Sequence, residues 1–216
     1  KSLIGLSNSE TSKLLKGEAG TTINLIIQRG DDKIPVKLTR ETIKIDNIPY
    51  YGMLDNNIGY INLTGFTQNA AQDVRNAIIK LKTNNDLKGL ILDLRGNGGG
   101  LLNEAISLSN LFVNKGELVA STRGKLSDRN RFYTTLEMPI DIELPLAILV
   151  DKRSASASEI VGGSIQDLDR GIIIGQNTFG KGLVQNIIPL SYNTRLKVTI
   201  AKYYIPSGRC IQAIDY

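Results

Sequence analysis

Three serines alternate with alanine in the segment RSASASEIVGG, at positions 154, 156 and 158. A strand expected at 144–150 precedes them and a helical pattern follows, so we expect them at a helix N-terminus. Unpaired N–H groups at such a terminus stabilise negative charge that develops beside them. One of these serines could act as a nucleophile, although the chain contains no histidine to accept its proton.

A plainer role is open to each of these serines, because serine is a favoured N-cap residue. A cap needs one hydroxyl and tolerates bulky neighbours, whereas here small residues alternate three times. We interpret this pattern as room left for a ligand.

Glycines at positions 96, 98, 99 and 100 lie between a strand that ends at Leu94 and a helix expected to begin near Leu101. Glycine permits a sharp turn and lets backbone N–H groups approach a ligand closely. The segment is therefore either a tight strand-to-helix turn or an anion or oxyanion pocket.

A third segment, GQNTFGKG at 175–182, places Lys181 between two glycines. It matches the phosphate-binding pattern G-x-x-x-x-G-K, but Gly182 replaces the serine or threonine that holds magnesium. The run LVQNIIPL that follows is strand-like, and the strand GLILDL with its aspartate comes earlier in the chain. Nucleotide binding is an alternative that these departures oppose.

Alternating strands and helices have to position these segments. The pattern predicts strands at 58–64, 89–94, 116–122, 144–150 and 170–175, helices at 69–82, 101–112 and 156–167, and a final hairpin through 187–205. Such alternation indicates an α/β domain with largely buried strands. We expect Asn69 and Gln72 to cap helix 69–82, and residues 124–143 to form a long surface loop.

Residues 1–40 contain a short helix pattern and two alternating strands around the turn Gly30-Asp31-Asp32, which predict a hairpin. They are too few to bury a core and are expected to be about half of a small domain. Residues 41–51 are expected to connect them to the main domain at 52–216.

The composition of the 216 residues, 41% hydrophobic and 22% charged, is typical of a soluble globular protein. The net charge of +5 is scattered rather than gathered in a basic stripe, which argues against nucleic-acid binding. One cysteine excludes a disulfide within the chain, and without histidine no zinc or haem site is expected. No apolar run approaches the roughly 18 residues of a membrane span. The chain starts without methionine or a signal-peptide pattern, and we expect it to be a fragment.

The three segments together resemble the C-terminal processing proteases, also called tail-specific proteases, and the resemblance covers essentially the whole chain. It rests on LILDLRGNGGGLLNEA, LVDKRSASASEIVGGSIQDLDRGIIIGQNTFGKGLVQ and YYIPSGRCIQ, in the family's order. It implies a crotonase-like α/β protease core with a serine–lysine dyad, preceded by a PDZ domain. Residues 3–39 resemble the latter half of that PDZ domain, whose first half is missing.

Matched residue by residue, the resemblance places the nucleophile on Ser156, the general base on Lys181, and the side chain that orients the lysine on Gln185. The oxyanion donors that it implies are backbone N–H groups of Gly99, Gly100 and Ala157. The glycine loop departs from the family pattern Asn-Asn-Gly-Gly-Gly at its first position, Gly96, and we expect no loss of activity from this departure.

A lysine acts as a general base only when it is neutral, and burial disfavours its charged form. We therefore expect the apolar neighbours Phe179, Leu183 and Val184 to surround Lys181. In an extended strand, residues 181 and 185 stand about 13 Å apart. We expect a bulge or turn within 180–184 that lets Gln185 reach the lysine amine in the active state, unless Gln185 pairs with a neighbouring backbone group.

The resemblance further implies a serine endopeptidase that needs no cofactor or metal and cleaves proteins near apolar C-termini through an acyl-enzyme. The PDZ domain would bind the tail as an added strand. Family members are exported, which implies the periplasm or cell envelope; an oligomer or a regulatory partner stays open. The rival interpretation is an inactive core that binds peptide tails without cutting them, and the intact Ser156, Lys181 and Gln185 argue against it.

Overall fold

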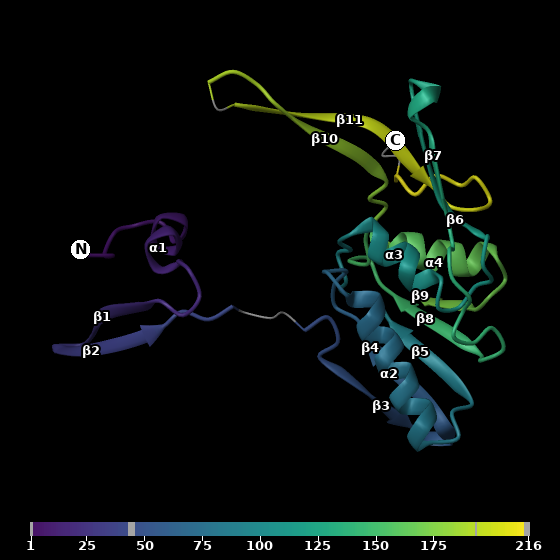
Figure 1. Cartoon of the computed structure of the whole chain (residues 1–216), viewed down its shortest axis with the longest axis horizontal. Helices are drawn as coiled ribbons and strands as arrows, with labels where there is room; N and C mark the ends of the chain where they lie inside the picture. Colours follow the sequence, from purple (N-terminus) through teal and green to yellow (C-terminus); the bar gives the residue numbers. More distant parts are fainter. Residues whose placement is uncertain (1, 43–45, 193, 214–216) are drawn as a thin grey trace. The chain divides into compact units, whose positions relative to one another are not determined.

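The computed structural model describes residues 2–42, 46–192 and 194–213 (Figure 1). The chain divides into two compact units, Lys1–Ile45 and Asp46–Tyr216. The second unit therefore begins within the segment expected to be a connector, and Tyr50 already opens the first strand of its main sheet.

The first unit contains one helix and one hairpin, as the sequence predicts: α1 (Asn8–Leu15), β1 (Thr22–Arg29) and β2 (Asp32–Thr39). Arg40 Nε donates to the Leu15 carbonyl at 2.8 Å and so links the end of the hairpin to the helix. No residue of 2–42 is buried. This matches the expectation that so short a stretch cannot bury a core.

The second unit is built on a five-stranded sheet of order β3-β4-β5-β8-β9. Its strands are β3 (Tyr50–Leu54), β4 (Ile58–Asn62), β5 (Gly89–Asp93), β8 (Leu146–Val150) and β9 (Ile172–Gly175). Strand β3 is antiparallel to β4, and the other neighbours are parallel. Parallel neighbours need crossover connections, which the alternation of strand and helix patterns provides.

Three helices, α2 (Ala70–Asn84), α3 (Leu102–Ser109) and α4 (Ala157–Asp167), accompany this sheet. Helix α2 packs on β3 and β4, and α3 and α4 lie next to a second sheet, where both contact β6 (Leu118–Gly124) (Figure 1). The second sheet is antiparallel, with the order β10-β11-β6-β7. Its other strands are β7 (Arg131–Thr134), β10 (Leu183–Pro189) and β11 (Arg195–Tyr204). Short 3-10 turns occupy η1 (Asp55–Asn57) and η2 (Ser127–Arg129). The predicted α/β class is confirmed.

The core of this unit lies between the five-stranded sheet and the helices. Side chains from both layers are completely buried, among them Ile61, Leu63, Val74, Ile78, Leu92, Leu94, Leu108, Ile148, Val161 and Ile165. Each such side chain contributes about 1.5 to 3 kcal/mol by leaving water. Within the described residues, none of the helices has the length and apolar character that crossing a bilayer would take.

The expectation of one long loop at 124–143 is wrong. Residues 131–134 form β7, which pairs with β6 across the turn η2. Strand β7 extends the second sheet by one edge strand.

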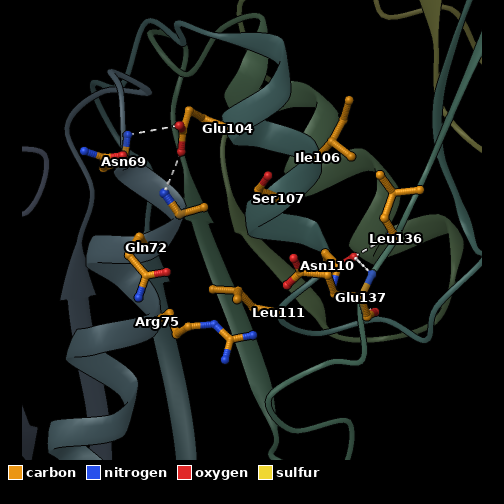
Figure 2. Close-up of a pocket in the computed structure, with 11 residues that line it drawn as sticks. Asn69, Gln72, Arg75, Glu104, Ile106, Ser107, Asn110, Leu111, Leu136 and Glu137 are labelled. Carbon is orange, nitrogen blue, oxygen red and sulfur yellow. Dashed lines mark hydrogen bonds between the residues drawn. The ribbon is translucent and has the colours of Figure 1, made fainter.

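The expected capping pair of α2 is also wrong. Asn69 has a left-handed backbone with φ 70° and makes no side-chain cap hydrogen bond, and Gln72 bonds to the side chain of Asn76 instead. The cap comes from Glu104 of α3, whose carboxylate accepts the N–H groups of Asn69 and Ala71 at 3.0 and 2.9 Å (Figure 2). Helix α3 thereby fixes the start of α2.

Candidate active site

Four loops follow the carboxyl ends of the four parallel strands. Strand β4 leads into 63–66, β5 into 95–100, β8 into 151–156 and β9 into 176–182. Carboxyl ends of parallel strands lie at one edge of the sheet, where α/β proteins form their ligand sites. The topology therefore gathers the three segments singled out in the sequence at a single edge.

The three serines lie in different environments. Ser154 and Ser158 are completely buried, and their hydroxyls donate to the carbonyls of Leu94 at 2.7 Å and Asn97 at 2.9 Å. Ser156 is only partly buried, and its φ of 56° and ψ of −109° are unusual for a residue with a side chain. A strained strand-to-helix turn of this kind exposes a nucleophilic serine in other hydrolases. Of the three, Ser156 alone has part of its surface exposed.

The glycine turn lies directly against the serine turn. A Cβ atom on Gly99 would stand 2.6 Å from the Ala155 carbonyl oxygen and 2.9 Å from the Ser156 Cβ, and the φ of Gly99 is 93°. A Cβ atom on Gly100 would stand 2.3 Å from the Phe66 carbonyl oxygen. Both glycines are required by the close approach of neighbouring backbone.

The backbone N–H groups of the two turns differ in whether they already have a hydrogen-bond acceptor. The N–H of Gly99 donates to Asn97 Oδ1 at 2.9 Å, so it is not free to bind a substrate in this structure. The N–H groups of Gly100 and Ala157 have no acceptor in the described part of the chain, and Ala157 is the first residue of α4. Two unpaired donors on adjoining turns are what an oxyanion needs.

Asn97 is completely buried and connects three loops of the site. Its side-chain amide donates to the Leu63 carbonyl at 2.8 Å, and its own carbonyl accepts the N–H of Ala155 at 3.0 Å. Sequence reasoning did not single out Asn97, although its place among the glycines was visible.

Asp151 anchors the serine turn from its other side. One carboxylate oxygen accepts the N–H groups of Gly96, Arg153 and Ser154 at 2.9, 2.9 and 3.1 Å. The contact from the Gly96 N–H is the main reason that the pKa of Asp151 falls to about 2. The carboxylate therefore stays charged and keeps the glycine turn attached to the serine turn.

Glu159, the third residue of α4, links the serine turn to the lysine loop. Its Oε2 accepts the N–H of Ser156 at 2.7 Å and that of Lys181 at 2.8 Å. Its Oε1 accepts the Thr178 hydroxyl at 2.7 Å and the N–H of Gly180 at 2.6 Å. Since one oxygen binds both nitrogens, the backbones of Ser156 and Lys181 lie within two hydrogen-bond lengths of each other.

The glycines beside Lys181 are also explained by close packing. A Cβ atom on Gly180 would meet Ala213, and one on Gly182 would meet the backbone of Gln212. The N–H of Ala213 donates to the Gly180 carbonyl at 2.9 Å, and the N–H of Gly182 donates to Gln212 Oε1 at 3.0 Å. Residues near the end of the described chain thus hold the lysine backbone on both sides.

The side chain of Lys181 is exposed, as are those of Phe179 and Leu183, at 62% and 38%. The expectation that these apolar neighbours bury Lys181 is wrong for this structure. Within the described residues, Lys181 Nζ makes no hydrogen bond or ion pair. The structure brings the backbones of Ser156 and Lys181 together but not their reactive atoms.

Gln185 lies in β10, where the pairing with β11 shifts register between Val184 and Gln185. Together with the positive φ of 83° at Gly180, this provides the non-extended backbone expected in the segment. The Gln185 side chain does not turn to the lysine, however, because its Nε2 donates to Thr199 Oγ1 at 3.3 Å.

The phosphate-loop alternative is not supported by the connections around Lys181. The lysine loop joins strand β9 to strand β10, so it is followed by a strand and not by the helix N-terminus that binds the phosphate in such a loop. Asp93, the aspartate of GLILDL, is paired with Arg95 at 2.6 Å and with the Tyr60 hydroxyl at 2.6 Å.

Residues 57–215 match the model of peptidase family S41. The chain belongs to this family. It is 45% identical over 219 residues to a carboxy-terminal-processing protease of Bartonella bacilliformis, covering 99% of this chain and 50% of the relative. It is 35% identical over 212 residues to the carboxy-terminal processing protease CtpA of Bacillus subtilis, covering 98% of this chain and 45% of the relative. The resemblance to C-terminal processing proteases is confirmed, and the chain spans about half the length of these relatives.

Solved structures agree with this assignment. The photosystem II D1 C-terminal processing protease superposes with a TM-score of 0.69 at 30% identity, covering 96% of this chain and 57% of that chain. A putative S41 protease from Bacteroides fragilis shares the fold, with a TM-score of 0.64 at 18% identity over 94% of this chain and 59% of that chain.

Proposed function

We propose that this chain carries the catalytic centre of a serine endopeptidase that cleaves proteins near their C-termini. One observation carries the proposal: the partly exposed Ser156 lies on a strained turn that adjoins the glycine turn, and the N–H groups of Ala157 and Gly100 on these two turns are unpaired within the described residues. The names of the relatives, C-terminal processing proteases, support the substrate class.

In the proposed reaction, the neutral amine of Lys181 takes the proton of the Ser156 hydroxyl while Oγ bonds to the scissile carbonyl carbon. The N–H groups of Gly100 and Ala157 stabilise the resulting oxyanion, and one such donor is typically worth about 3 to 4 kcal/mol of the barrier. The carbon–nitrogen bond then breaks, and the lysine ammonium gives its proton to the leaving amine. Water hydrolyses the ester on Ser156, with Lys181 again as the base.

In this proposal the structure, with its exposed Lys181 side chain, represents an open state that precedes catalysis. The backbone nitrogens of Ser156 and Lys181 share one oxygen of Glu159, so the flexible four-carbon side chain of lysine has only a short gap to span. We infer that Gln185 exchanges its bond to Thr199 for a bond to the lysine amine in the closed state.

The first unit and the location of the protein complete the proposal. We infer that residues 1–40 are the latter half of a PDZ domain that binds an extended substrate tail with an apolar end. We further infer an exported protein of the periplasm or cell envelope, by resemblance to the C-terminal processing proteases.

The test is incubation of the chain with a peptide that ends in a free apolar C-terminus, followed by mass spectrometry. The wild type is expected to cleave the peptide near its end, and Ser156→Ala is expected to leave it intact. Binding of the peptide without cleavage by the wild type would instead favour the non-catalytic tail-binding protein.

A further inference from the structure

Glu159 is a buried carboxylate, at 6% exposure, that contacts two loops of the site. Its four donors come from three positions on the lysine loop and one on the serine turn: Thr178, Gly180, Lys181 and Ser156. Within the described residues no lysine or arginine forms an ion pair with it. Its charge is therefore balanced by N–H and O–H donors and by the N-terminus of α4.

The two oxygens of a carboxylate can satisfy all four of these donors. Each oxygen accepts two donors, and a carboxylate is acceptor-only when it is ionised. A primary amide would replace one oxygen by an NH2 group, which cannot accept, so at least one of the N–H groups of Ser156, Gly180 and Lys181 would lose its acceptor. The position thus selects glutamate over its neutral isostere.

We propose that Glu159 is a positioning residue that holds the Ser156 turn and the Lys181 backbone in register for proton transfer. This inference rests on the proposed function, since it assigns a role to Glu159 in the same serine–lysine chemistry. The carboxylate of Glu159 bonds to neither reacting atom, Ser156 Oγ nor Lys181 Nζ, within the described residues; it acts through the two backbone N–H groups. Loss of this link lets the lysine loop move independently of the nucleophile.

The variant that tests the proposal is Glu159→Gln, which keeps the size of the side chain and removes its acceptor-only character. Glu104→Gln is a matched control, because Glu104 of α3 also accepts two backbone N–H groups at a helix start, that of α2 (Figure 2). Within the described residues it makes no hydrogen bond to the serine turn or the lysine loop. Glu159→Asp is the conservative variant, because it keeps the carboxylate but shortens the side chain by one methylene group.

The first readout is hydrogen exchange of single backbone amides by NMR, which requires no activity. In Glu159→Gln the amides of Ser156, Gly180 and Lys181 should exchange at least about tenfold faster than in the wild type. In Glu104→Gln they should exchange as in the wild type, while the amides of Asn69 and Ala71 speed up. Unchanged exchange of Ser156 and Lys181 in Glu159→Gln overturns the proposal, whether or not the chain is a protease.

The second readout is the division of the kinetic effect between kcat and KM on a cleavable peptide. Glu159→Gln should lower kcat about 100-fold with little change in KM, Glu159→Asp should recover part of the loss, and Glu104→Gln should keep the wild-type kcat. A wild-type kcat in Glu159→Gln, with an inactive Ser156→Ala, overturns the role of Glu159 and leaves the proposed function standing.

Discussion

Gly99 and Ser156 approach each other so closely that a Cβ atom on the glycine would lie 2.9 Å from the serine Cβ. They belong to loops that follow two adjacent parallel strands, β5 and β8. This contact brings together the two turns that carry the unpaired N–H groups of Gly100 and Ala157, the second of which also carries the partly exposed Ser156.

Gly99→Ala is expected to lower kcat about 100-fold, because the new methyl group must displace the serine turn. The change also strains the backbone at φ 93° and should destabilise the fold by about 1 to 3 kcal/mol. Gly98→Ala is the matched control, since a Cβ atom there meets nothing within 4 Å. Parallel measurement of kcat and the unfolding midpoint checks both effects, and a fully active Gly99→Ala would show that the contact has no role.

Replacing the three serines one at a time should separate chemistry from stability. Ser156→Ala is expected to abolish turnover and leave the unfolding midpoint nearly unchanged. Ser154→Ala and Ser158→Ala should keep wild-type turnover but lose about 0.5 to 1.5 kcal/mol of stability, because each removes one hydrogen bond to a buried carbonyl that keeps a backbone donor. Activity in Ser156→Ala would remove the nucleophile from the account.

The lowered pKa of Asp151 predicts how the free energy of unfolding changes at acid pH. Its pKa falls from an ordinary value of 3.8 to about 2 in the folded chain. A carboxyl group whose pKa is lower in the folded than in the unfolded chain stabilises the fold fully at pH values above its unfolded-state pKa. This stabilisation is lost as the pH falls through the folded-state pKa. The difference in free energy of unfolding between wild type and Asp151→Asn should be constant from neutral pH to about 5 and shrink between about pH 4 and 2. Denaturant titrations at these pH values check it, and a difference that persists at pH 2 would contradict it.

Thr199→Val is expected to raise kcat by up to about fivefold, the equivalent of one hydrogen bond of about 1 kcal/mol. The substitution removes the acceptor that holds the Gln185 amide in the open state and keeps the branched shape suited to a strand. Gln185→Ala should lower kcat in either background. If Thr199→Val were slower than the wild type, the bond between Gln185 and Thr199 would belong to the active form.

Periodicity and turn residues were sufficient to predict the parallel strands and their helices, because these are long, regular and locally encoded. They could not predict β7, which is four residues long and defined by its pairing with β6. The cap of α2 was also missed, because Glu104 lies more than thirty residues away in the chain.

The site shows the same division between local and distant causes. The pattern Ser156-Ala-Ser-Glu159 is that of a capping box and could have pointed to Glu159. Its bonds to Gly180 and Lys181 depend on how the next loop folds back, which no local pattern encodes. The expected burial of Lys181 failed because apolar residues that are neighbours in sequence, such as Phe179, face solvent here.

Direct detection of the acyl-enzyme tests whether Ser156 is the nucleophile and Lys181 is its general base. The chain is mixed with a cleavable peptide, quenched rapidly in acid and digested, and the acylated residue is located by mass spectrometry. An ester is expected on Ser156 in the wild type, and none in Ser156→Ala or in Lys181→Arg, whose guanidinium cannot give up its proton. An adduct on Ser154 or Ser158, or undiminished acylation in Lys181→Arg, would contradict these roles.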